Sequence, residues 1–313
     1  MVPHEVLARA RLLAAPQVDG PMARALERIT GRPVEHVSDS APDGPFLYVG
    51  DTLPGALRSR RLVWFHSVNA GTDAVLAAGP WPRGALLTRT VGRMGERIAQ
   101  YVLAWVLAEC QSVPEHTAQH ARAQWHRLPS TLAAGQTVVV HGTGRIGSAV
   151  AALLRACSLH TVGVCRTPRD VPPGFDRVVR AGGDEESAAL AGARWVVSTL
   201  PLTAATAGFF DGPRFTAMRG ASFLSVGRGA CVDMAALETA LRSGTVRRAV
   251  LDVLPEEPPA ADDRVWRLPR TVLTSHSAGI TADEDVVTDF EACWEAVTGG
   301  RVPALAVDTG RGY

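Results

Sequence analysis

A glycine-rich hexapeptide is the first segment of this sequence whose residue types imply chemistry. Residues 142–147 read Gly-Thr-Gly-Arg-Ile-Gly and lie between an apolar run at 137–141 and a helix-like stretch. In a turn from strand to helix, Gly142 permits the tight bend, Gly144 lets a pyrophosphate approach the backbone, and Gly147 lets the helix pack on the strand. Glycine-rich turns also occur as plain connectors, so the motif indicates a dinucleotide site only together with motifs further along the chain.

Three polar side chains follow predicted strands further along the chain. They are Arg228, Glu257 and His276, which lie far apart in the sequence. In open parallel sheets the ligand crevice lies beyond the carboxyl ends of the strands, so we expect the three side chains to converge on one cleft. Each also has a simpler interpretation: a capping or core histidine, a surface acid in a turn, and an arginine that caps a loop.

The elements that must position these residues are short β-rich runs that alternate with helical segments. From residue 137 onward this alternation predicts a Rossmann-type, doubly wound parallel sheet. Pro- and Gly-rich turns between further strands in the N-terminal part predict a smaller, flavodoxin-like α/β domain. The predicted strands are Thr137–His141, Thr161–Cys165, Trp195–Leu200, Ser222–Val226, Arg248–Val253 and Thr271–Thr274, and in the N-terminal part Phe46–Val49, Leu62–His66 and Ala85–Thr88.

Two longer helices flank the predicted nucleotide domain. Residues 98–110 are predicted to form a largely buried helix that joins the domains, and an amphipathic helix after Asp283 is predicted to return to the first domain. We therefore predict a substrate-binding domain of residues 1–95 and 284–313, and an NAD(P)-binding Rossmann domain of residues 96–283.

Composition excludes several classes of function. All 32 basic residues are arginine, which removes Schiff-base chemistry and a Walker lysine from consideration. The 31 acidic residues balance them, so no overall field favours nucleic acid or anionic lipid. No uncharged apolar run is long enough for a membrane span and the first residues do not resemble a secretory signal, so we expect a cytoplasmic protein. Cysteine and histidine spacings predict neither a disulfide framework nor a metal site.

Ordered matches along most of the chain resemble the D-isomer-specific 2-hydroxyacid dehydrogenase family, and in particular its glyoxylate/hydroxypyruvate reductase-like branch. The resemblance implies an NAD(P)H-dependent oxidoreductase that reduces a small 2-oxo acid to the D-2-hydroxy acid, and a homodimer. Besides the glycine motif, it rests on Pro201-Leu202-Thr203 with Thr206, Arg228-Gly229-x-x-Val232-Asp233, the run from Asp252 to Pro258, Ser275-His276, the loop from Ser67 to Asp73, Met94-Gly95-Glu96, Val307-Asp308 and Arg311-Gly312-Tyr313.

The same resemblance implies roles for the three polar side chains, and those roles suit the chemistry. Reducing a 2-oxo acid requires a proton donor, and an imidazolium is the natural acid near neutral pH, so His276 is expected to donate the proton. Glu257 is expected to hydrogen-bond the far ring nitrogen and to favour the charged form. The planar fork of Arg228 suits the carboxylate and carbonyl of the substrate.

The N-terminal loop carries the expected second contact to the substrate. Backbone N–H groups of Val68, Asn69 and Ala70 are expected to bind the substrate carboxylate. Asn69 stands where the family has glycine, and two interpretations stay open: a conservative turn substitution, since asparagine tolerates left-handed angles, or an amide that contacts the substrate. Ser225 replaces a usual asparagine. The candidates for the pocket that selects the substrate side chain are Trp64, His66, Arg89 and Arg93.

The second strand of the nucleotide domain ends at Cys165, where an NAD-preferring relative carries an acid for the ribose diol. Arg166 and Thr167, with Arg169 as a further candidate, would instead bind a 2′-phosphate, so we predict NADP, with NAD as a second possibility. Alternatively, Arg166 stacks on adenine and both cofactors are accepted. The residues expected to bind the cofactor are Gly142, Gly144, Arg145, Ile146, Gly147, Arg166, Thr167, Leu200, Pro201, Thr206, Val226, Gly227, Asp252, His276 and Ala278.

Two other functions stay open. One is a dehydrogenase on the same scaffold that acts on another small anion, such as a phosphonate analogue or a formate-like donor, which the departures at Asn69 and Ser225 allow. The other is a non-enzymatic, NAD(P)-sensing protein that resembles a corepressor, since fold does not fix function. The joint presence of Arg228, Glu257 and His276 argues against this second alternative.

Overall fold

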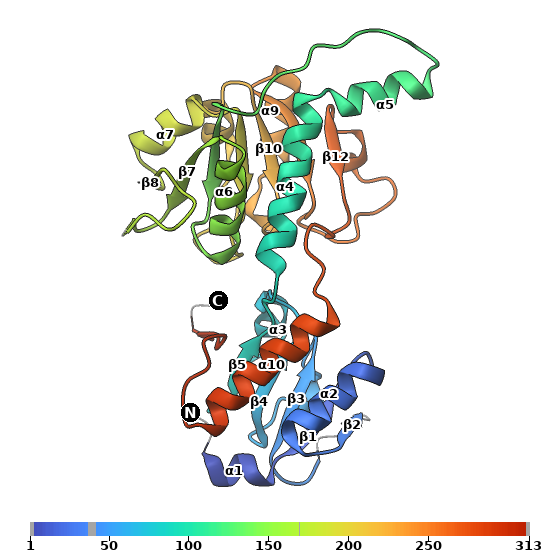
Figure 1. Cartoon of the computed structure of the whole chain (residues 1–313), viewed down its shortest axis with the longest axis vertical. Coiled ribbons are helices and arrows are strands. Elements are labelled where there is room, and N and C mark those ends of the chain that lie inside the picture. The colour runs from blue at the N-terminus through green and yellow to red at the C-terminus, as the bar shows by residue number, and fades with distance from the viewer. Residues whose placement is uncertain (1–2, 37–41, 169, 311–313) are drawn as a thin grey trace. The chain divides into compact units, whose positions relative to one another are not determined.

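The chain folds into two compact α/β units. The computed structural model describes residues 3–36, 42–168 and 170–310. Unit 1 comprises residues 1–94 and 281–313, and unit 2 comprises residues 95–280 (Figure 1). These divisions, after Met94 and after Ile280, lie close to those predicted after residues 95 and 283.

Unit 1 contains a parallel five-stranded sheet in the order β2–β1–β3–β4–β5, which is the flavodoxin-like order and agrees with the flavodoxin-like domain predicted here. Two strands escaped prediction: β1 lies in a Leu- and Ala-rich stretch that also suits a helix, and β2 is a three-residue edge strand. The elements are β1 (Arg11–Ala14), β2 (Val34–His36), β3 (Phe46–Gly50), β4 (Leu62–Ser67), β5 (Leu86–Arg89), α1 (His4–Arg9), α2 (Gly20–Thr30), the short helix η1 (Gly55–Leu57), α3 (Asp73–Ala77) and α10 (Asp283–Thr298).

Helix α10 covers one face of this sheet beside α2, as Figure 1 shows. Its apolar positions recur at helical spacing, so Phe290 and Trp294 both stack on the buried Trp64 of β4, with ring centroids 5.2 and 6.1 Å away. Val286 and Val297 complete the buried stripe. The predicted return of this helix to the first domain is confirmed.

A chain of buried hydrogen bonds joins β4 to β5 in the same core. Trp64 Nε1–H donates to Thr88 Oγ1 at 2.7 Å, and Thr90 Oγ1–H donates to the Ser67 carbonyl at 3.1 Å. His66 lies between the two hydroxyls, with Nδ1 2.7 Å from Thr88 Oγ1 and Nε2 3.1 Å from Thr90 Oγ1. Since Thr90 donates onward, Nε2 carries the proton, and burial lowers the pKa of His66 to about 3. Trp64 and His66, two of the candidates for the substrate pocket, are thus buried core residues of unit 1.

Unit 2 contains a parallel seven-stranded sheet in the order β12–β11–β10–β9–β6–β7–β8. Counted from β6, the order is 7-6-5-4-1-2-3, which is the Rossmann order with one strand added. All six predicted strands are present, whereas β8 was missed because it is short and carries arginine at both ends. The strands are β6 (Thr137–His141), β7 (His160–Cys165), β8 (Arg177–Arg180), β9 (Trp195–Ser198), β10 (Ala221–Ser225), β11 (Val246–Leu251) and β12 (Thr271–Leu273).

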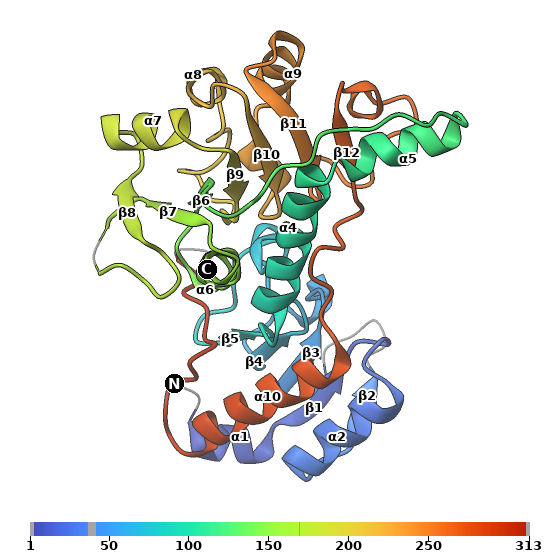
Figure 2. The ribbon, with the colours of Figure 1, turned by 45° about the horizontal axis from the view of Figure 1, so that its top comes forward.

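Helices cover both faces of the unit 2 sheet. Helix α6 packs on β6 and β7, whereas α8 and α9 pack on each other over an aromatic cluster that includes Phe210, Phe215 and Phe223. Helix α5 leads away from the sheet (Figure 2). None of the helices in the described residues is long and apolar enough to cross a membrane. The helices are α4 (Met94–Cys110), α5 (Val113–Ala121), α6 (Arg145–Ala156), α7 (Asp184–Ala191), α8 (Gly212–Ala217), η2 (Gly229–Cys231), α9 (Met234–Ser243) and η3 (Arg264–Arg267).

The buried neutral His66 predicts a loss of stability in acid. Its folded pKa of about 3 lies below the ordinary 6.5, so the unfolded chain takes up the proton first. The stabilisation is therefore complete above pH 6.5 and is lost as the pH falls towards 3, by up to about 1.4 kcal/mol per pH unit. Urea unfolding across this range should show a shallower pH dependence for His66→Gln than for the parent protein. The exposed His36→Gln should keep the parent dependence; an unchanged slope in His66→Gln would contradict the assignment.

Candidate active site

Three adjacent strands of unit 2 end at the same level. The register pairs Ser225 of β10 with Leu251 of β11, and Leu251 with Leu273 of β12. Because all three strands run parallel, the segments that follow them leave the same edge of the sheet. Arg228 and His276 each lie three residues beyond these aligned positions. The register therefore brings together the segments that carry the three predicted polar side chains.

The glycine-rich turn between β6 and α6 has the geometry that a dinucleotide requires. Gly142 has φ of +96°, which favours glycine, and a Cβ on Gly147 would lie 1.8 Å from the Gly142 carbonyl oxygen, so the helix meets the strand there. A Cβ on Gly144 would meet nothing within 4 Å, so the backbone is open at this position. Gly144 caps α6, whose exposed first residue is Arg145. The turn fits a pyrophosphate on the backbone N–H groups.

Thr199, which sequence reasoning missed, holds this turn in place. Its backbone N–H and its hydroxyl both donate to the carbonyl oxygen of His141, at 2.9 and 3.0 Å, and the hydroxyl lies 3.2 Å from the carbonyl oxygen of Gly142. Its only signal in the sequence is a hydroxyl near the end of the strand predicted over Trp195–Leu200; the observed strand β9 ends one residue before it, at Ser198.

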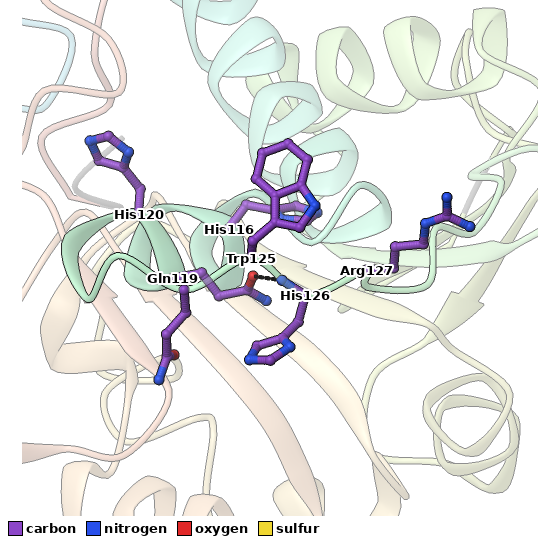
Figure 3. A pocket seen from close by; sticks show the side chains of 7 residues that line it. His116, Gln119, His120, Trp125, His126 and Arg127 are labelled. Carbon is purple, nitrogen blue, oxygen red and sulfur yellow. Dashed lines mark hydrogen bonds between the residues drawn. The ribbon is translucent and has the colours of Figure 1, made fainter.

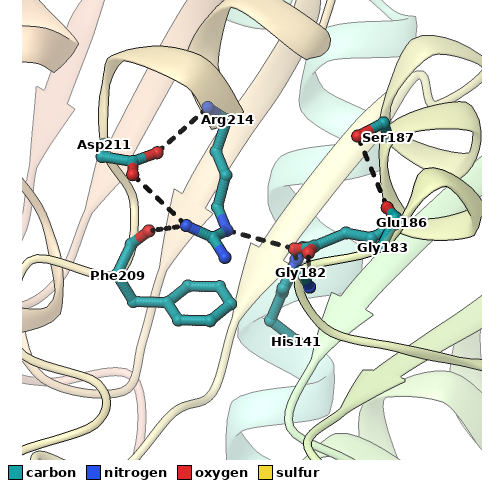
Figure 4. Close-up of polar contacts among 8 residues, drawn as sticks. All are labelled: His141, Gly182, Gly183, Glu186, Ser187, Phe209, Asp211 and Arg214. Carbon is teal, nitrogen blue, oxygen red and sulfur yellow. Dashed lines mark hydrogen bonds and ion pairs between the residues drawn. The ribbon is translucent and has the colours of Figure 1, made fainter.

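His141 also ends a strand of unit 2, but its surroundings differ from those of His276. Figure 4 shows its ring against Glu186 of α7, which also accepts from Arg214 of α8 and from the N–H of Gly182. Burial alone would raise the pKa of Glu186, but hydrogen bonds from His141 and Gly182 outweigh it and lower the pKa to about 2. Burial lowers the pKa of His141 despite this partner. His141 is thus a neutral core residue that cannot serve as an accessible acid.

His276 is exposed and carries the partner that the sequence predicted. Its Nδ1 lies 2.7 Å from Oε2 of Glu257, and the two side chains are 49% and 35% exposed. The other carboxylate oxygen of Glu257 accepts from the Leu254 N–H at 2.7 Å, which orients the acid. Glu257 therefore fixes the ring through Nδ1, so Nε2 is the nitrogen left to exchange a proton with a substrate.

Asp252 anchors the segment that carries His276. Its buried carboxylate accepts from Thr274 Oγ1 at 2.5 Å and from the N–H groups of Ser277 and Ala278 at 2.9 and 3.0 Å. Its carbonyl accepts from the His276 N–H at 2.8 Å. Asp252 and Ala278, both expected to bind cofactor, therefore bind each other in this structure.

Arg228 lies beside the turn that contains Glu257. A Cβ on the next residue, Gly229, would lie 1.9 Å from the carbonyl carbon of Leu254, so η2 packs directly against that turn. The Arg228 guanidinium is half-buried and one of its nitrogens donates to the Gly227 carbonyl at 2.9 Å. This bond restrains the side chain, and a planar fork of this kind suits a carboxylate.

The loops after β9 and β10 meet near the glycine turn. A Cβ on Gly227 would lie 2.5 Å from the Leu200 carbonyl oxygen, and Thr206 Oγ1 donates to the Pro201 carbonyl at 2.6 Å. The expected cofactor residues Leu200, Pro201, Thr206, Val226 and Gly227 therefore belong to two loops in contact. Ile146 lies in the first turn of α6 and is half-buried.

The residues expected at a 2′-phosphate follow β7. Cys165 ends the strand and is half-buried, whereas Arg166 and Thr167 are exposed. Arg169 lies outside the described residues, as do Arg311 to Tyr313 of the family resemblance. No carboxylate occupies the end of β7, so the described residues fit a phosphate there as well as a ribose diol.

The expected carboxylate-binding loop of unit 1 is only partly available. The Val68 N–H donates to the Gly50 carbonyl at 3.0 Å, so this donor belongs to the sheet and the prediction for Val68 is not supported. The Asn69 N–H contacts Ser67 Oγ at 3.2 Å, and Arg89 donates to the Ala70 carbonyl at 3.2 Å. Arg93 lies beside α10, where its N–H donates to Asp285.

A separate hollow of about 350 Å³ lies on α5 and the segment after it, and none of the residues that line it is a predicted site residue. Figure 3 shows three histidines, Trp125 and Arg127 around it. Among the described residues, no group of three or more His, Cys, Asp or Glu side chains could hold a metal ion. The lining residues are His116, Gln119, His120, Gln124, Trp125, His126 and Arg127.

The comparison with known proteins gives the family. The model of the D-isomer specific 2-hydroxyacid dehydrogenase NAD-binding domain matches residues 103–278, which is most of unit 2. The chain belongs to the D-isomer specific 2-hydroxyacid dehydrogenase family. It is therefore an oxidoreductase of that family whose second unit contains an NAD(P)-binding Rossmann domain.

Relatives of this dehydrogenase match more than four fifths of its length. A Streptomyces coelicolor protein described as an uncharacterized protein in the mprR 3′ region is 57% identical over 87% of this chain and 98% of its own. Glyoxylate/hydroxypyruvate reductase A of Serratia proteamaculans is 30% identical over 81% of this chain and 82% of its own. A Xanthobacter autotrophicus family member, solved in complex with NADPH and MES, superposes with a TM-score of 0.85 at 28% identity over 97% of this chain and 99% of its own.

Proposed function

We propose that this dehydrogenase reduces a small 2-oxo acid to the D-2-hydroxy acid with NADPH, as a glyoxylate/hydroxypyruvate reductase-like enzyme. The observation that carries the proposal is the 2.7 Å contact between His276 Nδ1 and Glu257 Oε2 at a strand end aligned with that of the Arg228 segment. A protein that only bound a dinucleotide would need the glycine turn but no exposed, oriented imidazole. The 30% identity to a glyoxylate/hydroxypyruvate reductase supports the same substrate class.

Each residue then has a defined task. When bound, the dihydronicotinamide supplies the hydride. His276 donates a proton from Nε2 to the oxygen of the substrate carbonyl, and Glu257 keeps the ring oriented through Nδ1. Arg228 binds the substrate carboxylate and polarises the carbonyl through its planar guanidinium.

A second contact to the substrate carboxylate is proposed for the loop in unit 1. Two donors remain from the predicted set, the N–H groups of Asn69 and Ala70. The Asn69 N–H already contacts Ser67 Oγ at 3.2 Å, a long hydrogen bond that a carboxylate can replace. The loop is held from the other side by the donation from Arg89 to the Ala70 carbonyl.

The glycine turn, the loops after β9 and β10 and the end of β7 are proposed to hold the cofactor. The preference for NADPH rests on Cys165, which stands where an acid would bind a ribose diol and repel a 2′-phosphate, and on Arg166 and Thr167, which can bind that phosphate. The Xanthobacter relative solved with NADPH supports this choice.

Replacement of His276 tests the proposed reaction. His276→Ala should lower the turnover of glyoxylate or hydroxypyruvate by roughly two to four orders of magnitude, because the proton donor is lost. NADPH affinity, measured by fluorescence titration, should change little. The replacement His141→Asn serves as a comparison, because that ring is buried at another strand end and should affect stability rather than proton transfer.

The reaction should be followed across a panel of 2-oxo acids, with a phosphonate analogue included. If the parent protein reduces a 2-oxo acid and His276→Ala reduces it at near-normal turnover, His276 is not the proton donor. If only the phosphonate series reacts, the substrate class is wrong; if nothing in the panel reacts while NADPH binds, the protein senses the nucleotide.

Replacement of Arg166 tests the cofactor preference. Arg166→Ala should weaken NADPH by roughly ten- to a hundredfold, because a charge-assisted contact to the 2′-phosphate is lost, and should weaken NADH much less. Dissociation constants for both cofactors measure the difference. The exposed Arg145, in the first turn of α6, provides a comparison: Arg145→Ala should weaken both cofactors alike. An equal loss in Arg166→Ala would indicate stacking on adenine.

A homodimer is proposed from the α5 arm, defined as residues 111–132. Trp125 and Leu132 on this arm are 95% and 77% exposed, which is unusual for large apolar side chains. Aromatic side chains of this kind commonly anchor interfaces, so a second copy of the chain is proposed to cover the arm.

Sedimentation of variants tests the dimer. Trp125→Glu should weaken association by roughly tenfold or more, because an interface anchor becomes a charge. Trp266→Glu in η3 alters a tryptophan that is 54% exposed but lies outside the arm, and it should sediment like the parent. A parent protein that sediments as a monomer at all concentrations would refute the proposal.

A further inference from the structure

A relay of hydroxyl groups connects helix α4 to the segment that carries His276. Tyr101 Oη lies 2.8 Å from Thr274 Oγ1, and Thr274 Oγ1 lies 2.5 Å from Asp252 Oδ1. A carboxylate can only accept, so Thr274 gives its single proton to Asp252. The Tyr101 hydroxyl must therefore donate to Thr274, and every bond in the relay has a defined direction.

The relay ends on the group that shapes the backbone around His276. His276 has φ of +53°, in the left-handed region that non-glycine residues rarely occupy. The Asp252 carboxylate fixes both flanks of this residue, through Thr274 before it and through the N–H groups of Ser277 and Ala278 after it. The carboxylate therefore has to keep one position for the His276 backbone to keep its conformation.

We propose that Tyr101 is a positioning residue for His276, acting through Thr274 and Asp252. The inference rests on the proposed role of His276 as proton donor. Tyr101 and Thr274 are not among the residues proposed to contact substrate or cofactor; through Asp252 they fix the position of the imidazole. Tyr101 lies on the long helix α4, which holds its ring edge-on to Trp105 with centroids 6.3 Å apart, so the donor starts from a rigid support.

The ionisation of Tyr101 supports this reading of the relay. Burial raises the pKa of the phenol above its ordinary value of 10. The phenol is therefore protonated throughout the working range and remains a donor. The Tyr101 hydroxyl therefore positions Thr274 at every working pH, and its own protonation does not change during the reaction.

Removal of single hydroxyl groups tests the proposal in the full-length protein. Tyr101→Phe keeps the ring and removes only the donor, Thr274→Val removes the middle hydroxyl, and Thr274→Ser retains it. Tyr48→Phe is the matched control, because Tyr48 is a buried tyrosine in unit 1 and takes no part in the relay.

Turnover should fall while substrate affinity holds. A displacement of a catalytic group by about 1 Å can lower the rate about a hundredfold. Loss of one hydrogen bond at the far end of the relay should displace the imidazole by less than this. Tyr101→Phe should therefore lower kcat roughly three- to tenfold. Thr274→Val should lower kcat roughly ten- to a hundredfold, whereas Thr274→Ser, which keeps the hydroxyl, should have the parent kcat. The KM for the 2-oxo acid should stay within about twofold. The double variant Tyr101→Phe/Thr274→Val should match Thr274→Val alone, because both act on one relay.

Amide hydrogen exchange gives a readout that needs no activity. In Tyr101→Phe the N–H groups of Ser277 and Ala278 should exchange faster, whereas that of Val250 in β11 should keep its parent rate. Parent kcat and parent exchange in Tyr101→Phe would overturn the positioning role, and so would kcat losses that simply add in the double variant. If His276→Ala keeps its turnover, the proposed reaction fails, while the exchange rates still decide whether the relay holds the segment.

Discussion

The buried carboxylate of Asp252 is the interaction on which the candidate active site depends. Hydrogen bonds to a charged group contribute about 1.5 to 3 kcal/mol each, and this carboxylate accepts three from the segment after β12. A non-glycine residue held in the left-handed region costs about 1 to 3 kcal/mol. The bonds from Thr274, Ser277 and Ala278 are thus sufficient to hold His276 at its positive φ. Without them, the segment would relax to a more ordinary backbone and the imidazole would leave the strand end.

Environment, rather than sequence position, separates the two histidines that lie at or just beyond the carboxyl ends of strands in unit 2. His141 is enclosed by Phe209 and Phe210 and bonded to Glu186, so desolvation keeps it neutral. His276 keeps half of its side chain in solvent and meets Glu257 from one side only. The His141 ring connects the end of β6 to Glu186 of helix α7. The His276 ring is accessible and can exchange a proton. The same residue type therefore serves packing in one place and chemistry in the other.

The sequence allowed prediction where one physical rule applied to a whole segment. Parallel strands end on one edge, so Arg228, Glu257 and His276 could be grouped before their distances were known. Strands with continuous apolar runs were found, whereas β1, β2 and β8 were missed because short strands with polar or helix-favouring residues give no clear period. Thr199 and Tyr101 were missed for another reason. A hydroxyl shows its partner only when the fold brings distant segments together, as with the 173 positions between Tyr101 and Thr274.

The glycine turn and the polar groups of His276, Glu257 and Arg228 all belong to unit 2. Their mutual geometry is set by one sheet, through the register of β10 to β12 and the packing of α6 on β6. The unit 1 loop is built differently: its first donor, the Val68 N–H, is committed to the Gly50 carbonyl, and its next, from Asn69, makes a long bond to Ser67. A rigid sheet edge suits groups that must meet reacting atoms within fractions of an ångström, whereas a loop with exchangeable hydrogen bonds suits a group that binds and releases a carboxylate. The two kinds of construction thus match the two tasks that the proposed reaction assigns to them.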